Sequence, residues 1–142
     1  MPRLALIGNP LSHSFSKQYF ETKFSQLSLP NWHYDLWELQ SLNDLNSKVI
    51  ATEDLVGFNV TIPYKVQIMA QCQTLSEAAR SIGAVNCVKV IHSPNGIQLH
   101  GENTDVHGFE MSLMNWYIKN KKAALVFGNG GAAKAALYVL KA

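Results

Sequence analysis

The sequence predicts an α/β fold in which a mostly parallel sheet carries helices on both faces. Short apolar runs that end at turn residues alternate with segments in which apolar residues recur every three or four positions. The first pattern is typical of buried strands and the second of amphipathic helices. Their alternation favours parallel strands with helices on each side. At 142 residues, 47% of them hydrophobic, the chain is long enough for a sizeable core.

Strand and helix signals follow one another through the first 60 residues. The apolar run 4–7 stops at Gly8-Asn9-Pro10 and predicts a strand. Ser16 is placed to cap a helix, whose apolar face consists of Phe20, Phe24 and Leu27. Strands are expected at 32–37 and 55–60, and the helix between them carries Leu42, Leu45 and Val49.

The middle of the chain predicts two further helices. Pro63 stands where the first of them is expected to begin, a position that tolerates proline. Val66 and Met69 are expected to point from this helix into the core. The second helix covers residues 76–82 and ends at Gly83.

A hairpin and the start of a new unit follow. Strands at 84–91 and 97–100 flank the turn Ser93-Pro94-Asn95-Gly96, which predicts an antiparallel hairpin at one edge of the sheet. The next helix has an apolar face made of Val106, Phe109, Leu113 and Trp116. A strand at 123–127, a glycine loop and a helix from Ala132 complete the chain.

Composition and charge exclude several classes of protein. Charged residues make up 15% and the net formal charge is +2, which argues against a disordered chain, a coiled coil and a nucleic-acid-binding surface. Cys72 and Cys87 are too few for a disulfide framework and lack the spacing of a zinc ribbon. The apolar runs are too short for a signal peptide or a membrane span. We therefore expect a soluble cytoplasmic protein without membrane or nucleic-acid partners.

Polar and apolar residues alternate where the strand 55–60 ends. Asn59 and Thr61 share one face of the extended chain, and their apolar neighbours share the other. Ligands of open α/β sheets bind at the carboxyl ends of strands, which favours a binding role for both residues. Lys65 follows in the first turn of the expected helix, where its charge opposes the helix dipole. It is either a catalytic group or a solvated surface lysine.

Three serines, Ser12, Ser14 and Ser16, alternate between the first strand and the first helix. Hydroxyl groups at a helix N-terminus can hold a carboxylate or a polyol. The alternative is that one serine caps the helix while the others face solvent.

Segment 100–107 holds two histidines and two acids, which are residue types found in metal sites. The start His100-x-Glu102 resembles that of zinc deaminases, but the Pro-Cys-x-x-Cys half of that motif does not follow. We therefore predict no metal site. Asp105 is expected at a strand-to-helix junction, where it either caps the helix or pairs with Lys65 across a cleft as an acid/base group.

A glycine-rich loop precedes the last helix. It occupies the strand–loop–helix context of a dinucleotide fingerprint, and Ala135 stands where the third glycine of that fingerprint packs helix on strand. Eleven residues follow Gly131, whereas a full fingerprint needs a βαβ unit of about 30 residues. We expect a truncated Rossmann βα unit.

Five sequence blocks occur in one order along the chain. They are Ser14-Phe15-Ser16, Asn59-Val60-Thr61-Ile62-Pro63-Tyr64-Lys65, Gly83-Ala84-Val85-Asn86, Asn103-Thr104-Asp105 and Gly128-Asn129-Gly130-Gly131-Ala132. Together they resemble the shikimate dehydrogenases. The resemblance runs from residue 6 to residue 135, and its second and fourth blocks are the most specific. It implies an N-terminal lobe that binds substrate and a C-terminal Rossmann lobe that binds the cofactor.

The resemblance also implies an activity, the NADPH-dependent reduction of 3-dehydroshikimate to shikimate in aromatic amino-acid biosynthesis. Lys65 and Asp105 would be the catalytic pair. The other substrate-binding residues would be Ser14, Ser16, Asn59, Thr61 and Asn86. The pyrophosphate of NADP would lie against Gly128, Asn129, Gly130, Gly131 and Ala132.

The sequence departs from the family pattern at three positions, without removing an implied functional side chain. Lys17 stands where proline is usual, Cys87 where threonine is common and Val106 where glycine is frequent. Lys17 adds a positive charge near the implied site of the substrate carboxylate.

The resemblance divides the chain in two. Residues 1–103 would form the substrate-binding domain, and residues 104–142 a linking helix with the start of an incomplete dinucleotide-binding domain. At this length we expect substrate binding without turnover, and a homodimer is a further expectation. The alternatives are a non-catalytic module that binds shikimate or a similar hydroxy acid, and a quinate/shikimate dehydrogenase relative.

Overall fold

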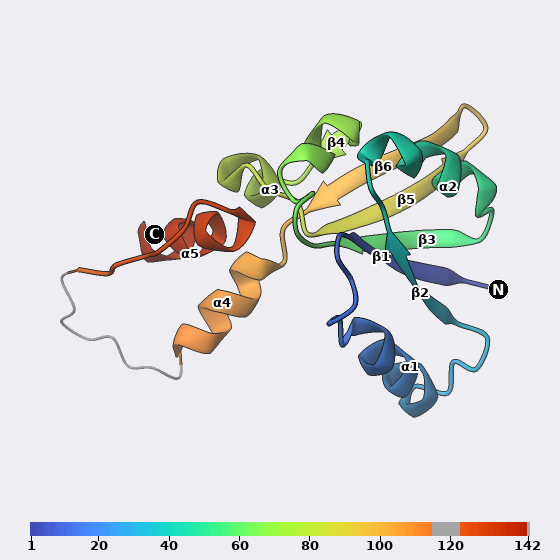
Figure 1. The fold of residues 1–142 in the computed structure, drawn as a ribbon, viewed down its shortest axis with the longest axis horizontal. Helices are drawn as coiled ribbons and strands as arrows, with labels where there is room; N and C mark the ends of the chain where they lie inside the picture. Colours follow the sequence, from blue (N-terminus) through green and yellow to red (C-terminus); the bar gives the residue numbers. More distant parts are fainter. Residues whose placement is uncertain (115–122, 142) are drawn as a thin grey trace.

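The structure is a computed structural model that describes residues 1–114 and 123–141. Its centre is a six-stranded sheet with strand order β2-β1-β3-β5-β6-β4 (Figure 1). The strands are β1 (Arg3–Gly8), β2 (His33–Glu38), β3 (Leu55–Val60), β4 (Thr74–Leu75), β5 (Cys87–Ser93) and β6 (Gly96–Glu102). The α-helices are α1 (Ser16–Gln26), α2 (Leu45–Ala51), α3 (Glu77–Ile82), α4 (Asp105–Met114) and α5 (Gly131–Lys141). Two 3₁₀ segments are η1 (Leu42–Asp44) and η2 (Gln67–Gln71).

The sheet is mixed, and its first three strands run parallel. β1 pairs with β2 on one side and with β3 on the other. β5 runs antiparallel to β3 and forms the predicted hairpin with β6. The hairpin does not lie at the edge of the sheet, as was expected, because the two-residue β4 pairs in parallel outside it. Three of these five pairings are parallel, so the predicted fold class is confirmed.

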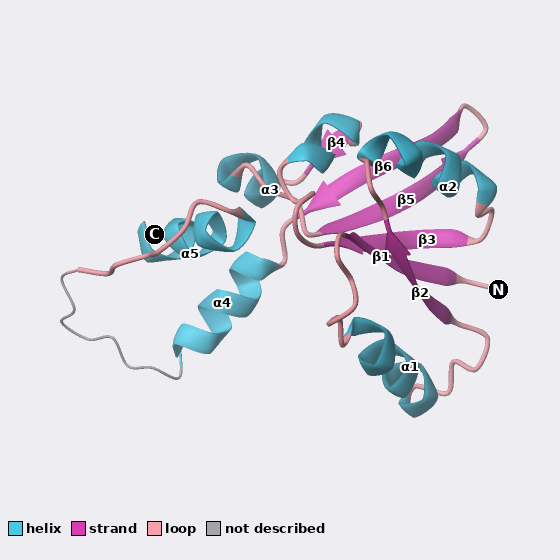
Figure 2. Ribbon diagram, in the orientation of Figure 1, coloured by secondary structure: helices cyan, strands magenta, loops and turns pink. Residues whose placement is uncertain are grey.

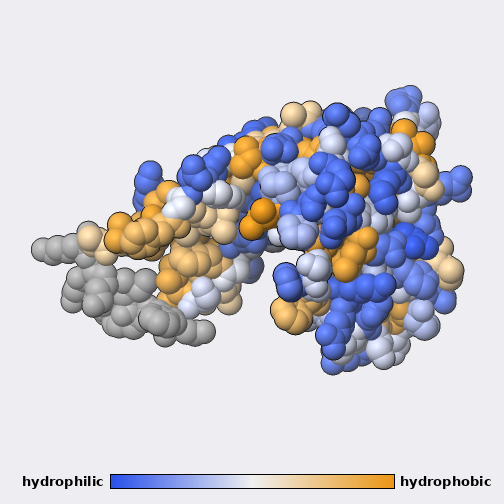
Figure 3. All heavy atoms as spheres, in the orientation of Figure 1, coloured by the Kyte–Doolittle hydropathy of each residue, from blue (hydrophilic) through white to orange (hydrophobic). Residues whose placement is uncertain are grey.

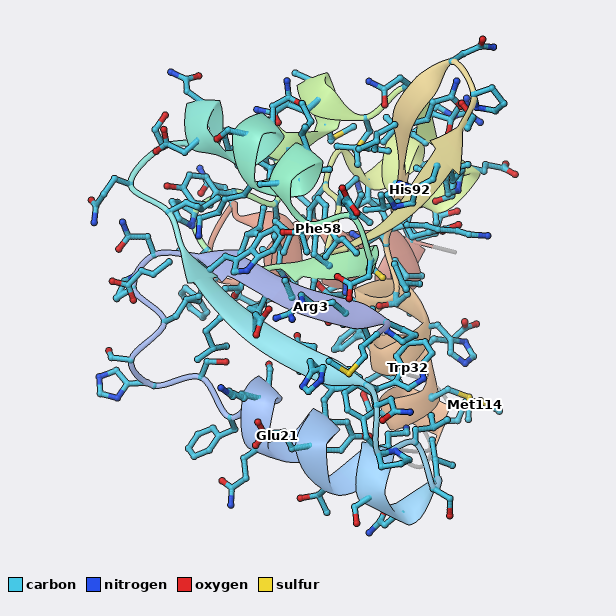
Figure 4. The ribbon with its side chains drawn as sticks, turned by 90° about the vertical axis from the view of Figure 1, so that its right-hand side faces the viewer. Arg3, Glu21, Trp32, Phe58, His92 and Met114 are labelled. Atoms are coloured by element: carbon cyan, nitrogen blue, oxygen red, sulfur yellow. The ribbon has the colours of Figure 1, made fainter. Side chains whose placement is uncertain are left out.

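Helices cover both faces of the sheet, as predicted (Figure 2). On one face η1, α2 and η2 pack over the main core cluster, which includes Phe58 and Ile68. On the other face α1 packs over Tyr34, and the rings of Phe20 and Tyr34 stack with their centroids 4.4 Å apart. Trp32 packs against the cluster beneath α1, so it lies across the sheet from Phe58 (Figure 4).

The short-range signals of β3 and α3 are confirmed. The predicted strand 55–60 has the bounds of β3, and the predicted helix 76–82 differs from α3 by one residue. The hydroxyl of Ser76 accepts a hydrogen bond from the backbone nitrogen of Ala79 at 3.2 Å and caps α3. Gly83 ends the helix with a φ of +70°, a conformation that glycine adopts without strain.

The start of α1 differs from the prediction. The N-cap position belongs to Phe15 rather than Ser16, and no side chain caps it. The hydroxyl of Ser14 instead accepts a hydrogen bond from the backbone nitrogen of Ser16 at 3.3 Å. Ser16 is therefore already helical. Leu27, expected on the apolar face of α1, lies just beyond the helix and is exposed.

The α-helix expected from Pro63 does not form. The backbone nitrogen of Tyr64 donates to the carbonyl oxygen of Thr61 at 3.0 Å, which makes a turn, and only η2 is helical after it. The buried side chain of Tyr64 anchors this turn to the core. Ile68 is fully buried and Val66 is exposed, so the prediction is wrong for Val66. Met69 is partly buried against the core cluster, as predicted.

The strand expected at 123–127 is also absent, although α5 forms as predicted. This segment pairs with no strand of the described ranges, and a strand gains its stability from pairing. Leu125 and Phe127 are therefore exposed, and further apolar residues are exposed on α4 and α5 (Figure 3). Trp116, expected on the apolar face of α4, lies outside the described residues. Within the described ranges we find no helix with the length and apolar character needed to cross a membrane.

One contact of α5 brings the glycine loop to the sheet. Ala135 is buried against Ile82 and Ala84, with Val106 of α4 packed beside them. Ala84 precedes β5, which is a neighbour of β3. The N-terminus of α5 therefore lies close to the chain segment that follows β3.

The substitution Ile68→Ala tests which residue of the segment after β3 holds it to the core. Because Ile68 is fully buried, we expect a loss of about 2–5 kcal/mol in the free energy of unfolding, measured by urea denaturation. Val66→Ala is the matched control and is expected to cost less than about 1 kcal/mol, since Val66 is exposed. Equal losses in the two variants would contradict this arrangement.

Candidate functional site

Lys65 and Asp105 form an ion pair at the carboxyl end of β3. The distance from Lys65 Nζ to Asp105 Oδ2 is 2.6 Å, and both side chains are partly buried. Lys65 lies in the turn after β3, where its carbonyl oxygen accepts a hydrogen bond from the backbone nitrogen of Val85 at 2.7 Å. Asp105 is the first residue of α4, where a negative charge is favoured by the helix dipole. The structure thus joins two residues that lie 40 positions apart in the sequence.

Asn86 holds Asp105 in this position. Its amide nitrogen donates to Asp105 Oδ1 at 2.8 Å and to Thr104 Oγ1 at 2.9 Å. Its amide oxygen accepts from the backbone nitrogen of Thr104 at 2.8 Å. Both carboxylate oxygens of Asp105 therefore have a partner, one in Lys65 and one in Asn86.

Asn59 and Tyr34 form a second pair on the face of the sheet that α1 covers. The hydroxyl of Tyr34 donates to Asn59 Oδ1 at 2.9 Å. Burial raises the pKa of Tyr34 to about 12, while hydrogen bonding with the Ser16 side chain acts in the opposite direction. Ser16 therefore reaches the same small cluster from α1.

Ser14 and Thr61 lie beside these groups without bonding to the ion pair. The Ser14 side chain is taken up by the hydrogen bond that it accepts from the start of α1. Thr61 is bound through its backbone nitrogen to the carbonyl oxygen of Ile7 at 2.9 Å. Its methyl group lies against Gly8, where a Cβ atom would approach it to 2.5 Å. Only glycine at position 8 leaves room for the Thr61 side chain.

The glycine loop closes one side of this site. A cavity of about 460 Å³ lies between the turn after β3 and the loop, and Thr61, Lys65, Phe127, Gly130 and Ala132 are among its lining residues. A Cβ atom on Gly131 would lie 2.9 Å from Lys65 Cδ, so glycine at this position allows α5 to approach the lysine. Gly128 has a φ of +115°, which favours glycine in the loop.

The histidine and acids of segment 100–107 are arranged otherwise. His100 contacts Glu102 Oε1 at 3.0 Å through Nε2, and Thr74 Oγ1 at 2.7 Å through Nδ1. Asp105 faces Lys65 instead. Within residues 1–114 and 123–141, no three His, Cys, Asp or Glu side chains are placed to share a metal ion.

Comparison with known proteins identifies the family. Residues 6–88, more than half of the chain, match the family described as shikimate dehydrogenase substrate binding domain. The chain belongs to the shikimate dehydrogenase family. This confirms the resemblance found in the sequence blocks.

The relatives are oxidoreductases of greater length than this chain. A shikimate dehydrogenase (NADP(+)) of Caldicellulosiruptor bescii is 39% identical over 143 residues, which cover 99% of this chain and 48% of the relative. The pentafunctional AROM polypeptide of Kluyveromyces lactis is 37% identical over 139 residues, which cover 96% of this chain and 9% of that polypeptide. This chain thus spans about half the length of the bacterial relative.

A solved structure shares the fold. The crystal structure of the shikimate 5-dehydrogenase of Thermus thermophilus in complex with NADP(H) and shikimate superposes with a TM-score of 0.84 at 33% identity. The match covers 99% of this chain and 52% of the Thermus chain.

Two residues of this candidate site escape sequence reasoning. Thr104 contacts Asn86 through its backbone and its hydroxyl, although the Asn-Thr-Asp block had drawn attention only to its aspartate. Tyr34 is joined to Asn59 across β1, which lies between their strands. One usable signal for Tyr34 is its place in a predicted strand of the sheet, because a buried phenol needs a hydrogen-bond partner.

The raised pKa of Tyr34 predicts a loss of stability in alkali. The folded chain holds the phenol neutral up to about pH 12, whereas the unfolded chain ionises at a pKa of 10.0. The contribution of the neutral phenol to the free energy of unfolding is complete below pH 10 and is lost as the pH rises towards 12. The total loss amounts to about 2–3 kcal/mol. Urea denaturation across this range should show a smaller loss in Tyr34→Phe than in the parent chain. Part of the loss remains in the variant, because burial also raises the pKa of the Cys72 thiol to about 11. In Tyr19→Phe, which changes an exposed tyrosine, the alkaline loss should persist; its disappearance there would contradict the assignment.

Proposed function

We propose that the chain binds shikimate and 3-dehydroshikimate beside Lys65 and takes part in the NADPH-dependent reduction of 3-dehydroshikimate. The observation that carries this proposal is the 2.6 Å pair between Lys65 and Asp105. It lies at the carboxyl end of β3, where open α/β sheets bind ligands. Relatives named shikimate dehydrogenase (NADP(+)), and a relative solved with shikimate and NADP(H), support the choice of substrate and cofactor.

The substrate is proposed to lie against hydroxyl and amide groups. Shikimate carries a carboxylate and several hydroxyl groups, so its site must supply many donors and acceptors. The residues proposed for this are Ser14, Ser16, Asn59, Thr61 and Asn86, together with the ion pair. They come from the start of α1, the end of β3 and the segments that precede β5 and α4.

The glycine loop fits the pyrophosphate of a dinucleotide. Gly130 has open space around it, and Gly131 leaves no side chain between the loop and Lys65. The free N–H groups at the N-terminus of α5 favour an anion. The residues proposed to hold the pyrophosphate are Gly128, Asn129, Gly130, Gly131 and Ala132. When bound, NADPH supplies the hydride for the carbonyl carbon.

The residues of the chain act on the carbonyl oxygen. As the carbonyl is reduced, its oxygen gains negative charge and needs a proton. The Lys65 ammonium is proposed to stabilise that charge and to donate the proton. Asp105 orients the lysine through the 2.6 Å contact, and Asn86 keeps the carboxylate from turning away. The division at residues 103 and 104, the homodimer and the cytoplasmic location stay predictions.

Calorimetric titration of shikimate into the chain tests the binding site. We expect saturable binding that weakens about 10-fold or more in Lys65→Ala and in Asp105→Asn, because each change removes a charged hydrogen-bond partner. Lys89→Ala and Glu110→Gln change exposed residues of β5 and α4 and should bind like the parent chain. A chain with a native far-UV spectrum that binds no shikimate would contradict the proposal. A parallel titration with quinate measures the breadth of the site.

Turnover of 3-dehydroshikimate with NADPH separates an enzyme from a binding module. If Lys65 donates the proton, Lys65→Ala should lower the rate about 10²- to 10⁴-fold. Shikimate binding without turnover, in a protein whose glycine loop binds NADPH, would favour the non-catalytic module.

A further inference from the structure

Tyr34 is a buried phenol with a fixed ring. Its exposed fraction is 2%, and its ring lies parallel to that of Phe20 on α1 with an interplanar angle of 6°. Stacking against α1 on one side and the sheet on the other leaves the ring little freedom to turn. The position of its hydroxyl is therefore set by the core rather than by the site.

This hydroxyl decides how the amide of Asn59 is oriented. It donates to Asn59 Oδ1 at 2.9 Å. The amide oxygen is thereby occupied, and in the described part of the chain the amide nitrogen has no hydrogen-bond partner.

We propose that Tyr34 is a positioning residue that makes Asn59 a hydrogen-bond donor towards the ligand. An unrestrained asparagine can present either its oxygen or its NH₂ group, because the two ends have nearly the same shape. With the oxygen held by Tyr34, Asn59 turns its two N–H donors away from the phenol and towards the ligand. Resting on the proposed binding of shikimate, this inference specifies that Asn59 contacts a ligand oxygen that accepts a hydrogen bond.

Tyr34 would thereby influence which ligands bind, although it does not itself contact the ligand. A donor that a ligand buries without offering an acceptor is costly, so a ligand that lacks an oxygen at this position is penalised. When the Tyr34 hydroxyl is removed, Asn59 is free to turn over and the penalty falls. Tyr34 acts through Asn59 and, in the described part of the chain, makes no hydrogen bond to Lys65 or Asp105, so its removal should raise KM and leave kcat unchanged.

Shikimate titration of Tyr34→Phe, Asn59→Ala and the double variant tests this coupling. Phenylalanine keeps the stack on Phe20 and deletes only the hydroxyl, so we expect affinity to fall about 2- to 10-fold. The double variant should bind no more weakly than Asn59→Ala, because Tyr34 acts only through Asn59. Independent, multiplying losses, or an unchanged affinity in Tyr34→Phe, would overturn the proposal. Tyr19→Phe, which changes an exposed tyrosine of α1, is the control.

Asn59→Asp separates positioning from folding. An aspartate still accepts from Tyr34 but offers no donor, so the fold should be kept, as judged by the thermal midpoint, and shikimate binding should be lost. Asn59→Asp that binds as tightly as the parent chain would overturn the proposal.

A measurement without ligand distinguishes failure of this inference from failure of the proposed function. In the ¹⁵N–¹H spectrum of the free chain, the side-chain amide signals of Asn59 should shift and broaden in Tyr34→Phe and stay in place in Tyr19→Phe. Unchanged Asn59 signals overturn the positioning role whether or not shikimate binds. Changed signals in a chain that binds no shikimate support the positioning role and reject the proposed substrate.

Discussion

Asn86 connects several parts of the molecule, because both its backbone groups and its side-chain amide form hydrogen bonds. Its carbonyl oxygen accepts from the backbone nitrogen of Val60 at 2.8 Å, and its own nitrogen donates to the carbonyl oxygen of Glu102 at 3.0 Å. Its side chain reaches Thr104 and Asp105 at the start of α4. Leaving such a buried group unpaired costs about 1–3 kcal/mol. Asn86 therefore holds the ends of β3 and β6 and the start of α4 together. The position of the Asp105 carboxylate is fixed by this arrangement.

The electrostatics of the site depend on that arrangement. Both carboxylate oxygens of Asp105 accept hydrogen bonds, one from Lys65 and the other from Asn86. Lys65 lies in a turn instead of the first turn of a helix, so the unfavourable helix dipole expected from the sequence does not act on it. Instead, the N-terminus of α4 favours the negative charge of its partner. A ligand that binds to the Lys65 ammonium must therefore do so while the ammonium remains hydrogen-bonded to Asp105.

Local signals in the sequence were reliable where the structure they describe is local. α3 is defined by its own cap at Ser76 and by Gly83, and β3 by an apolar run between turn residues. The segment 123–127 has an equally good strand pattern, but a strand requires a neighbour that its own residues do not encode. The segment after Pro63 was misassigned for a related reason, since Tyr64 is bound to the carbonyl oxygen of Leu39, far away in the chain. The contact of Tyr34 with Asn59 joins residues 25 positions apart, and no local pattern indicates it. The pairing of Lys65 with Asp105 is predictable from chemistry alone, because an ammonium and a carboxylate attract each other.

The missing side chain of Gly131 has a consequence for how such proteins change. A Cβ atom there would lie 2.9 Å from Cδ and 3.1 Å from Cβ of Lys65, so the loop and the lysine occupy adjoining space with none to spare. Any replacement of the loop by one from another dinucleotide-binding protein must keep a glycine at that position or displace the lysine. The two halves of the chain thus cannot diverge independently. If recombination replaced the segment that contains the loop, we expect the new segment to be accepted only when it also carries glycine at position 131.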